Sequence, residues 1–216
     1  MFISLEGIDG SGKTTLAKEL AKKNDDLYFV SRKDLPSVDG FIKEQMRKVA
    51  SLMWTSNHGM LDHLLPTDYW IFLQLTWYCL LYEFTIKPLI ESKKNIVIDG
   101  WYYKFWARLE LQNIDIKYLK VLFSHIPAPD HVILLDVNVE DIFLRKTGFK
   151  AYEMGSHITG QSENTTTSFM EFQNGTFKNL KKYSSELDWD IVDLPSSDIE
   201  CNCNKINEIL ARFYQC

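Results

Sequence analysis

The chain begins with a glycine-rich loop between an apolar segment and a helical pattern, and this feature constrains the fold more than any other. Gly7, Gly12, Lys13 and Thr14 fit the spacing G-x-x-x-x-G-K-[ST] that is typical of phosphate-binding loops. Glycine lets the backbone curl so that successive N–H groups point at phosphate oxygens, and we expect a side chain at Gly10 or Gly12 to obstruct that nest. The lysine adds positive charge for the β- and γ-phosphates, and the threonine hydroxyl is a hard oxygen ligand that suits Mg²⁺.

The surroundings of the loop fit this interpretation. The loop follows the apolar residues 2–5, which predict a strand, and apolar residues at helical spacing begin at about Lys13. The N-terminal end of such a helix attracts anions. The alternative is a glycine turn that merely joins a strand to a helix, and we predict instead a site for a nucleoside triphosphate. Its expected contacts are Gly7, Asp9, Gly10, Ser11, Gly12, Lys13, Thr14 and Thr15.

Composition narrows the class of protein. With 216 residues, 45% of them apolar and 25% charged, the chain can bury the core of one compact domain, which we expect to span residues 1–216. The net charge of -5 gives no global electrostatic reason to propose a nucleic-acid partner. The longest uncharged stretch, 69–82, is too short to span a bilayer. Because residue 2 already belongs to a predicted strand, we expect no signal peptide, no membrane partner and a cytoplasmic location.

Predicted strands alternate with predicted helices along the chain. We expect strands at 2–5, 27–31, 95–99, 131–137 and 189–192. Helices are expected from about residue 13, at 41–52 and 67–91, from the third strand to about 111, and at 139–146, 169–187 and 204–213. Such alternation favours an α/β fold of three layers, in which helices cover both faces of a parallel sheet.

One long polar segment, 148–168, interrupts this pattern. Irregular segments of this length within a compact domain are commonly mobile functional loops, although a solvated surface excursion is the alternative. Arg145, Lys146 and Lys150 stand at its entrance. Cations on a movable flap can close over a transferring phosphate and exclude water. We therefore predict a lid at about 145–168.

Short segments of the chain resemble the thymidylate kinase family, in that family's order. They are SLEGIDGSGKTT, SRKDLPSVDGFIKEQMRKV, IKPLIESKKNIVIDGWYY, VILLDVNVEDIFLRKTG and FKAYEMG. The first segment is specific to phosphate binding. The other segments support the resemblance because they follow one another in the family's order. The resemblance implies a P-loop kinase of the nucleoside monophosphate kinase type, which moves the γ-phosphoryl group of ATP to a nucleotide with Mg²⁺. It also implies a homodimer.

The resemblance implies roles for the donor side of the site. Lys13 and Thr14 match the residues that hold phosphates and Mg²⁺, and Asp99 matches an aspartate that orients the metal or its waters. The loop has no arginine of its own, so the lid should supply one, and Arg145 stands in register. Asp99 also fits a strand-end residue that caps the next helix, and this alternative stays open.

The acceptor side is matched by fewer residues. Asp9 matches a family carboxylate that meets the acceptor sugar, and Glu153 matches the acidic tail of the lid. Arg32 and Arg47 fit either acceptor contacts or plain surface charges. The implied catalytic set is Lys13, Asp9, Asp99 and Arg145.

Three positions depart from the family. The residue after the strand aspartate is arginine in the family, but here it is Gly100. On the long helix, Tyr78 stands where an arginine should meet the acceptor, and Gln74 stands where an aromatic ring should stack on the base. Aromatic residues crowd this helix, and they fit either a base platform or a core stripe.

A phosphorylated acceptor still needs cations, because charge-assisted hydrogen bonds hold a dianion. Lys104 and Arg108 are four residues apart and share one face if their segment is helical. We predict that this pair replaces the missing arginines, the alternative being a solvated helix face. If the acceptor carries no phosphate, it is instead a nucleoside, a modified nucleotide or another small hydroxyl compound. A non-catalytic nucleotide-binding module is the remaining alternative.

Overall fold

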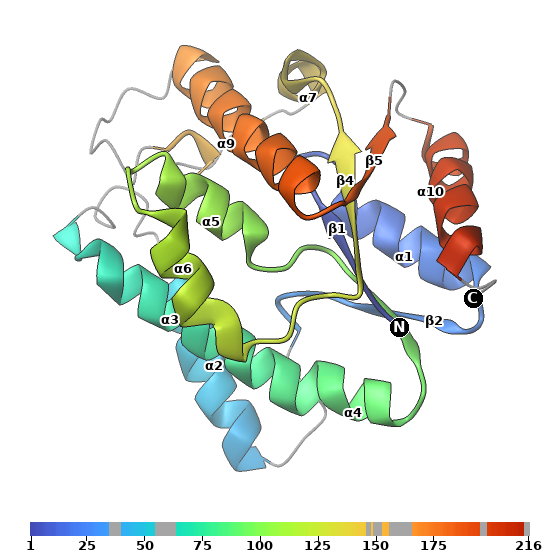
Figure 1. The fold of residues 1–216 in the computed structure, drawn as a ribbon, viewed down its shortest axis with the longest axis horizontal. Helices are drawn as coiled ribbons and strands as arrows, with labels where there is room; N and C mark the ends of the chain where they lie inside the picture. Colours follow the sequence, from blue (N-terminus) through green and yellow to red (C-terminus); the bar gives the residue numbers. More distant parts are fainter. Residues whose placement is uncertain are drawn as a thin grey trace.

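A parallel sheet forms the centre of the molecule (Figure 1). The structure is a computed structural model that describes residues 1–34, 40–54, 64–145, 148, 153–155, 166–194 and 198–213. The five strands have the order β2-β3-β1-β4-β5, and every pairing is parallel. Their bounds are β1 (Phe2–Glu6), β2 (Leu27–Val30), β3 (Asn95–Ile98), β4 (His131–Asp136) and β5 (Asp190–Asp193). The predicted α/β fold with a parallel sheet is confirmed.

Helices cover both faces of the sheet. They are α1 (Lys13–Lys23), α2 (Gly40–Trp54), α3 (Thr67–Leu81), α4 (Lys87–Glu91), α5 (Tyr103–Glu110), α6 (Ile116–Leu122), α7 (Val139–Arg145), α9 (Thr166–Glu186) and α10 (Ile199–Phe213). Successive strand residues alternate between two core clusters, so that Phe2 packs on the side of α3 and α5 while Ile3 packs on the side of α1 and α10. This alternation explains why the strands read as continuous apolar runs, since both faces are buried.

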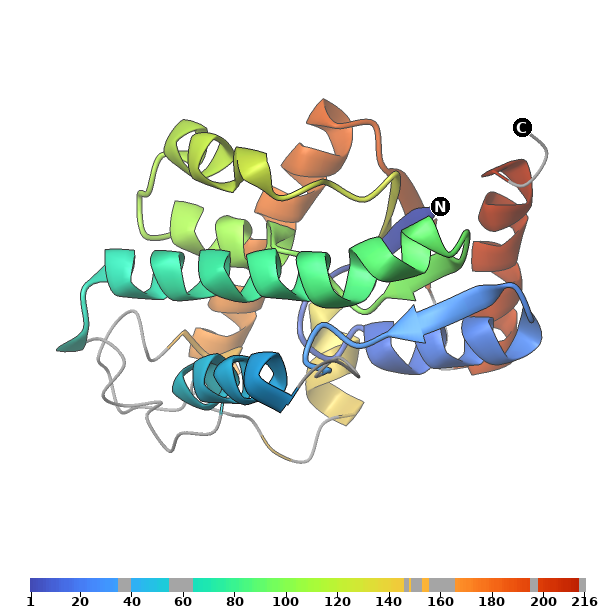
Figure 2. The ribbon, with the colours of Figure 1, turned by 90° about the horizontal axis from the view of Figure 1, so that it is seen from below.

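The long predicted helix 67–91 contains a π-helical segment, η3 (Tyr82–Ile86), between α3 and α4. Figure 2 shows these three elements as one continuous rod along the molecule. Pro88 lies in the first turn of α4 and has no backbone N–H to donate to the preceding turn. The π-helical segment accommodates this proline without ending the rod, because it widens the turn where an ordinary helical bond is lost.

Two helices differ from the sequence expectation. Helix α6 was not predicted, and Asp115 caps its start: the Asp115 carboxylate accepts a hydrogen bond from the backbone N–H of Lys117 at 2.8 Å. Helix α10 begins at residue 199 rather than 204, because Asp198 accepts from the N–H of Glu200 at 2.9 Å. Aspartate caps of this kind satisfy free N–H groups in a first helical turn. Across the described ranges, no helix combines the length and apolar character needed to cross a membrane.

The topology places the carboxyl ends of β1 and β3 side by side. These strands are neighbours, with Ser4 paired to Ile98. The helices that follow them, α1 and α5, lie on opposite faces of the sheet (Figure 1). In open α/β sheets, ligands bind where the connections of adjacent strands diverge in this way. The glycine-rich loop and Asp99 both follow these strand ends.

Candidate active site

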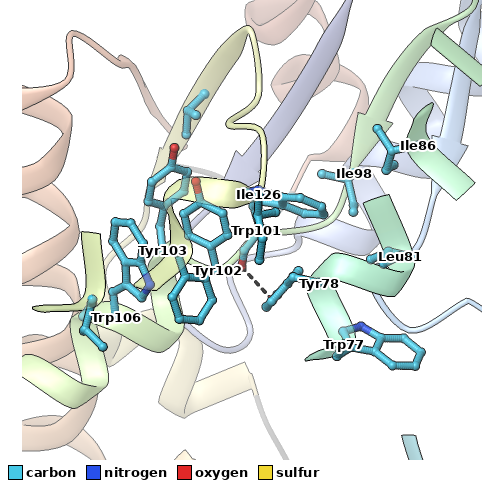
Figure 3. Close-up of a cluster of buried hydrophobic side chains, with 14 of the residues drawn as sticks. Trp77, Tyr78, Leu81, Ile86, Ile98, Trp101, Tyr102, Tyr103, Trp106 and Ile126 are labelled. Atoms are coloured by element: carbon cyan, nitrogen blue, oxygen red, sulfur yellow. Dashed lines mark hydrogen bonds between the residues drawn. The ribbon is translucent and has the colours of Figure 1, made fainter. Parts of the chain in front are cut away.

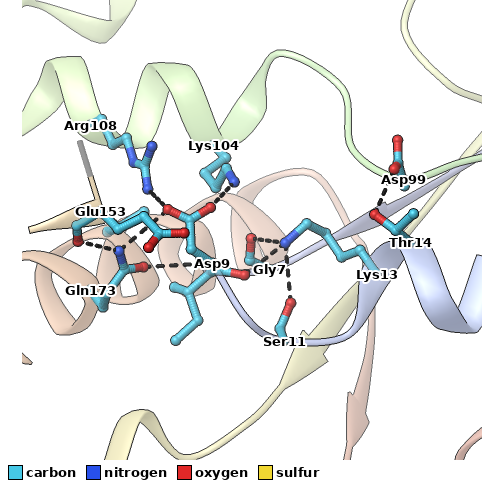
Figure 4. A network of polar contacts seen from close by, with 12 residues as sticks. Gly7, Asp9, Ser11, Lys13, Thr14, Asp99, Lys104, Arg108, Glu153 and Gln173 are labelled. Atoms are coloured by element: carbon cyan, nitrogen blue, oxygen red, sulfur yellow. Dashed lines mark hydrogen bonds and ion pairs between the residues drawn. The ribbon is translucent and has the colours of Figure 1, made fainter. Parts of the chain in front are cut away.

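The glycine-rich loop folds around the side chain of Lys13 (Figure 4). Its ammonium group donates to the carbonyl oxygens of Gly7 at 2.9 Å and Ile8 at 2.7 Å, and to Ser11 Oγ at 3.1 Å. Burial lowers the pKa of Lys13 to about 8, although Asp9 opposes this shift. The three partners of the ammonium group are neutral oxygens, which an anionic phosphate can replace.

Two glycines of the loop are required for different reasons. Gly12 ends the loop with a φ of 88°, in the left-handed region that favours glycine, and directly precedes α1. Gly10 has a φ of 83°, and a Cβ atom there would lie 2.5 Å from Ile142 Cγ2 of α7. The expected obstruction at Gly10 is thus a clash with the neighbouring helix, a cause that the sequence argument did not anticipate.

Asp99 lies directly across from the start of α1. Thr14 Oγ1 donates to Asp99 Oδ2 at 2.7 Å, and the backbone N–H of Arg32 donates to Asp99 Oδ1 at 2.7 Å. Helix α5 begins only at Tyr103, and its N-cap residue, Tyr102, makes no side-chain cap hydrogen bond. The alternative that Asp99 caps this helix is therefore wrong. A hydroxyl and a carboxylate joined in this way are hard oxygen ligands that fit Mg²⁺.

Gly100 lies beside the side chain of Arg32. Its φ is 126°, and a Cβ atom there would lie 3.6 Å from Arg32 Cδ and 4.0 Å from Lys13 Cε. Trp77 Nε1 donates to the carbonyl oxygen of Arg32 at 2.9 Å and so fixes the backbone that carries it. The structure thus brings Arg32 across the position where the family has an arginine.

The two candidate acceptor arginines lie in different surroundings. Burial alone would lower the pKa of Arg32, but Tyr78, Asp99 and Asp9 outweigh it and raise the pKa above its usual value. The guanidinium of Arg32 therefore lies among site residues and is not a plain surface charge. Arg47 is exposed on α2, and its contact with an acceptor remains a prediction.

Tyr78 lies in a buried aromatic cluster (Figure 3). Its hydroxyl donates to the carbonyl oxygen of Trp101 at 2.9 Å, and its ring meets the Trp101 ring at a centroid distance of 4.9 Å. Burial raises the pKa of Tyr78 to about 12. Tyr78 is therefore a core residue whose hydroxyl group also lies beside the side chain of Arg32, which brings it to the edge of the site. Phe72 on the same helix is exposed.

Asp9 holds the two cations of α5 (Figure 4). Lys104 Nζ lies 2.5 Å from Asp9 Oδ1, and an Nη atom of Arg108 pairs with Asp9 Oδ2. Burial would raise the pKa of Asp9, but Arg108, Lys104 and Lys13 outweigh it and hold the pKa well below its usual value. The two cations share one face of the helix, as predicted, and they point into the site. The alternative of a solvated helix face is wrong.

Gln173 links the loop to the predicted lid, a role that the sequence reasoning missed. Its Oε1 accepts from the backbone N–H of Asp9 at 3.2 Å, and its Nε2 donates to the carbonyl oxygen of Glu153 at 2.7 Å. Gln173 is fully buried on α9, between apolar positions such as Phe169 and Leu180. A lone amide at helical spacing within an apolar face was the signal that could have revealed it.

Glu6 is a second residue that the sequence reasoning missed. Its Oε1 accepts from the backbone N–H of Trp101 at 2.6 Å and from Ser4 Oγ at 3.0 Å. The side chain is 0% exposed, and burial raises its pKa. Because Glu6 ends β1 and Trp101 leads into α5, this carboxyl group fixes the acceptor-side loop against the strand that carries the glycine-rich loop.

Most of the predicted lid lies outside the described residues, including Lys146 and Lys150. Arg145 is exposed at the end of α7, where its Nε donates to the carbonyl oxygen of Asp141 at 3.0 Å. Its contact with a phosphate therefore remains a prediction. Glu153 is buried beside Asp9 and Gln173 (Figure 4).

Comparisons with known proteins agree on one family. A family model described as thymidylate kinase matches residues 5–192. A probable thymidylate kinase of Sulfurisphaera tokodaii is 32% identical over 149 residues, which cover 67% of each chain. The probable thymidylate kinase 2 of Saccharolobus solfataricus is 24% identical over 216 residues, 95% of this chain and 94% of the relative. The crystal structure of thymidylate kinase from Ehrlichia chaffeensis matches the fold with a TM-score of 0.64 at 18% identity, covering 98% of both chains.

Proposed function

The chain belongs to the thymidylate kinase family, and we propose that its site moves the γ-phosphoryl group of ATP to the phosphate of a nucleoside monophosphate. It is a phosphotransferase of nucleotide metabolism. One observation supports the location of the reaction most strongly. Lys13, buried in the glycine-rich loop, lies beside the hydrogen-bonded pair of Thr14 and Asp99 at the adjacent carboxyl ends of β1 and β3.

Lys13 is the donor-side catalytic residue in this proposal. Its ammonium group donates to neutral oxygens, those of the carbonyl groups of Gly7 and Ile8 and of the hydroxyl of Ser11. A triphosphate offers it charged oxygens instead, and charge-assisted hydrogen bonds are roughly twice as strong as neutral ones. Catalysis then consists mainly of positioning and charge neutralisation, since phosphoryl transfer needs little covalent chemistry from the protein.

Thr14 and Asp99 are the proposed holders of Mg²⁺. Their oxygens are already joined at 2.7 Å, and Asp99 is kept in place by the backbone N–H of Arg32. Held by these two residues, Mg²⁺ would supply positive charge that neutralises the negative charge of the phosphates. The use of ATP and Mg²⁺ is general in the family, and we extend it to this chain on this pair of oxygen ligands.

We place the acceptor on the side of α3 and α5. Arg32 supplies a cation there, close to Asp9 and Asp99. It takes over part of the role of the arginine that the family has at position 100. Asp9 is the proposed contact of the acceptor sugar. Glu153 and Arg145 belong to the proposed lid, which closes over the phosphates. A homodimer is proposed on the family resemblance alone.

The nucleobase of the acceptor is the least constrained feature. Gln74 and Tyr78 stand where the family has an aromatic ring and an arginine, and the Tyr78 hydroxyl donates to the carbonyl oxygen of Trp101. This observation favours a second candidate, in which the chain phosphorylates a nucleotide other than thymidylate or a hydroxyl compound without phosphate.

An acceptor screen tests the proposal directly. Purified protein with ATP and Mg²⁺ is offered each nucleoside monophosphate, the matching nucleosides and small hydroxyl compounds, and ADP formation is measured. We expect turnover with at least one monophosphate and little with its nucleoside. Turnover with hydroxyl compounds alone would select the second candidate, and absence of turnover with every acceptor would leave only a non-catalytic nucleotide-binding module.

A further inference from the structure

We propose that the acceptor phosphate replaces Asp9 as the partner of Lys104 and Arg108, so that acceptor binding is an exchange of one anion for another. In the structure the two cations of α5 hold Asp9 itself (Figure 4). Asp9 therefore masks the acceptor site until a stronger anion arrives. This inference rests on the proposed function, because it takes the acceptor to be a phosphorylated compound.

The first support is the burial of the three groups. Their side chains are 7% exposed for Lys104, 13% for Arg108 and 10% for Asp9. Surface ion pairs contribute little and are easily replaced by water, whereas buried charges must keep a partner. When Asp9 releases these two cations, the arriving anion must therefore pair with them, since water cannot satisfy buried charges.

The second support is an imbalance of charge around Lys104. Burial lowers the pKa of Lys104 well below its usual value, Lys13, Arg32 and Arg108 lower it further, and Asp9 opposes them. Lys104 and Arg108 thus both pair with the carboxylate of Asp9. A phosphate dianion adds charge of the missing sign and has more acceptor oxygens than a carboxylate, so it can satisfy both cations together.

The third support is an unused donor on Arg108. Among the described residues, its Nε atom is buried without a hydrogen-bond partner. The guanidinium lies over the Phe172 ring at 5.0 Å from the ring centroid, so that its plane is held while its edge carries the donors. The planar fork of arginine matches phosphate oxygens with two parallel hydrogen bonds. A buried, oriented and unused donor indicates a ligand with acceptor oxygens.

Exchange also has a consequence for Asp9. Gln173 holds the backbone N–H of Asp9, so the residue stays in place when its carboxylate loses the two cations. The released carboxylate can then accept a hydrogen bond from an acceptor hydroxyl group. Because Asp9 belongs to the glycine-rich loop, the acceptor changes the electrostatics beside Lys13 without touching it.

Binding of thymidine 5′-monophosphate, uridine 5′-monophosphate and inorganic phosphate, each without ATP, tests the exchange by calorimetry. Asp9→Asn removes the competing anion, so we expect it to bind at least one probe about tenfold more tightly than the wild type, which is about 1.4 kcal/mol. Lys104→Gln and Arg108→Gln should each weaken the same probe by about tenfold or more. Lys182→Gln is the matched control. Lys182 lies on α9 and pairs with Glu110 of α5 at 2.7 Å, but unlike Lys104 and Arg108 it is exposed. This variant should change nothing.

Tighter binding by Asp9→Asn is the decisive result, since a residue that only contacts the acceptor would weaken binding when changed. Unchanged or weaker binding by Asp9→Asn would overturn the exchange. If Asp9→Asn is poorly folded because two buried cations lose their partner, its melting temperature replaces calorimetry. Phosphate should then raise that temperature more than it raises the wild type's, and an equal rise would overturn the proposal.

The exchange and the proposed function fail in different ways. If the wild type phosphorylates a nucleoside monophosphate but Asp9→Asn gains no affinity, the exchange alone is wrong. If Asp9→Asn gains affinity but the wild type transfers no phosphoryl group, the binding site stands and the proposed reaction is wrong. ATP affinity should stay within about twofold in Lys104→Gln and Arg108→Gln, because the donor loop keeps its own contacts.

Discussion

Restoring the family's arginine at position 100 should harm this protein rather than improve it. Gly100 has a φ of 126°, a backbone conformation that other residues adopt only under strain. Strain of this kind costs about 1–3 kcal/mol. In Gly100→Ala the strain acts alone, because the added Cβ would lie 3.6 Å from Arg32 Cδ, an ordinary contact. In Gly100→Arg a third cation is also placed beside Arg32 and Lys13.

Thermal and urea unfolding of both variants measure these costs. For a domain of this size, 1 kcal/mol shifts the melting temperature by about 2–4 °C. We expect Gly100→Ala to lose about 1–3 kcal/mol, and Gly100→Arg to lose more and to bind the acceptor less well. Gly40→Ala is the control, since position 40 starts α2 and no described residue lies within 4 Å of an added Cβ atom. A Gly100→Ala variant as stable as the wild type would refute the strain argument, and a stable Gly100→Arg with higher acceptor affinity would refute the role of Arg32.

Three further predictions concern the reaction. Lys13→Ala should reduce turnover by several orders of magnitude, whereas the control Lys22→Ala, on the exposed face of α1, should not. More than about a tenth of the wild-type activity in Lys13→Ala would contradict the role of Lys13, since a tenfold loss is only about 1.4 kcal/mol of transition-state stabilisation. Asp99→Asn keeps the shape but not the charge, so a Mg²⁺ titration of turnover should shift to higher concentration, and an unchanged titration would exclude Asp99 from the metal site. ATP with an acceptor should protect residues 148–168 from limited proteolysis, and Arg145→Ala should lower kcat more than ATP affinity; identical cleavage with and without ligands would argue against a lid.

Local signals were sufficient to predict the glycine-rich loop between β1 and α1. The spacing from Gly7 to Thr14 lies within eight successive residues, and each residue type has its own chemical reason to occur there. The alternation of apolar segments predicted the parallel sheet, because strands buried on both faces read as continuous apolar runs. Helix α6 was missed because its seven residues are too few to show a clear helical periodicity. Its start depends on a single capping residue, Asp115.

The acceptor half depended on contacts between distant parts of the chain. Asp9 meets Lys104 across 95 residues and Gln173 across 164, and Glu6 meets Trp101 across 95. The sequence determined that Lys104 and Arg108 share a helix face, because that follows from a spacing of four. It did not determine what the face meets, since a polar helix face is stable in water as well as against a buried carboxylate. Only the packing of α5 on α9, with the loop after β1 beside them, decided that these two cations are buried on Asp9.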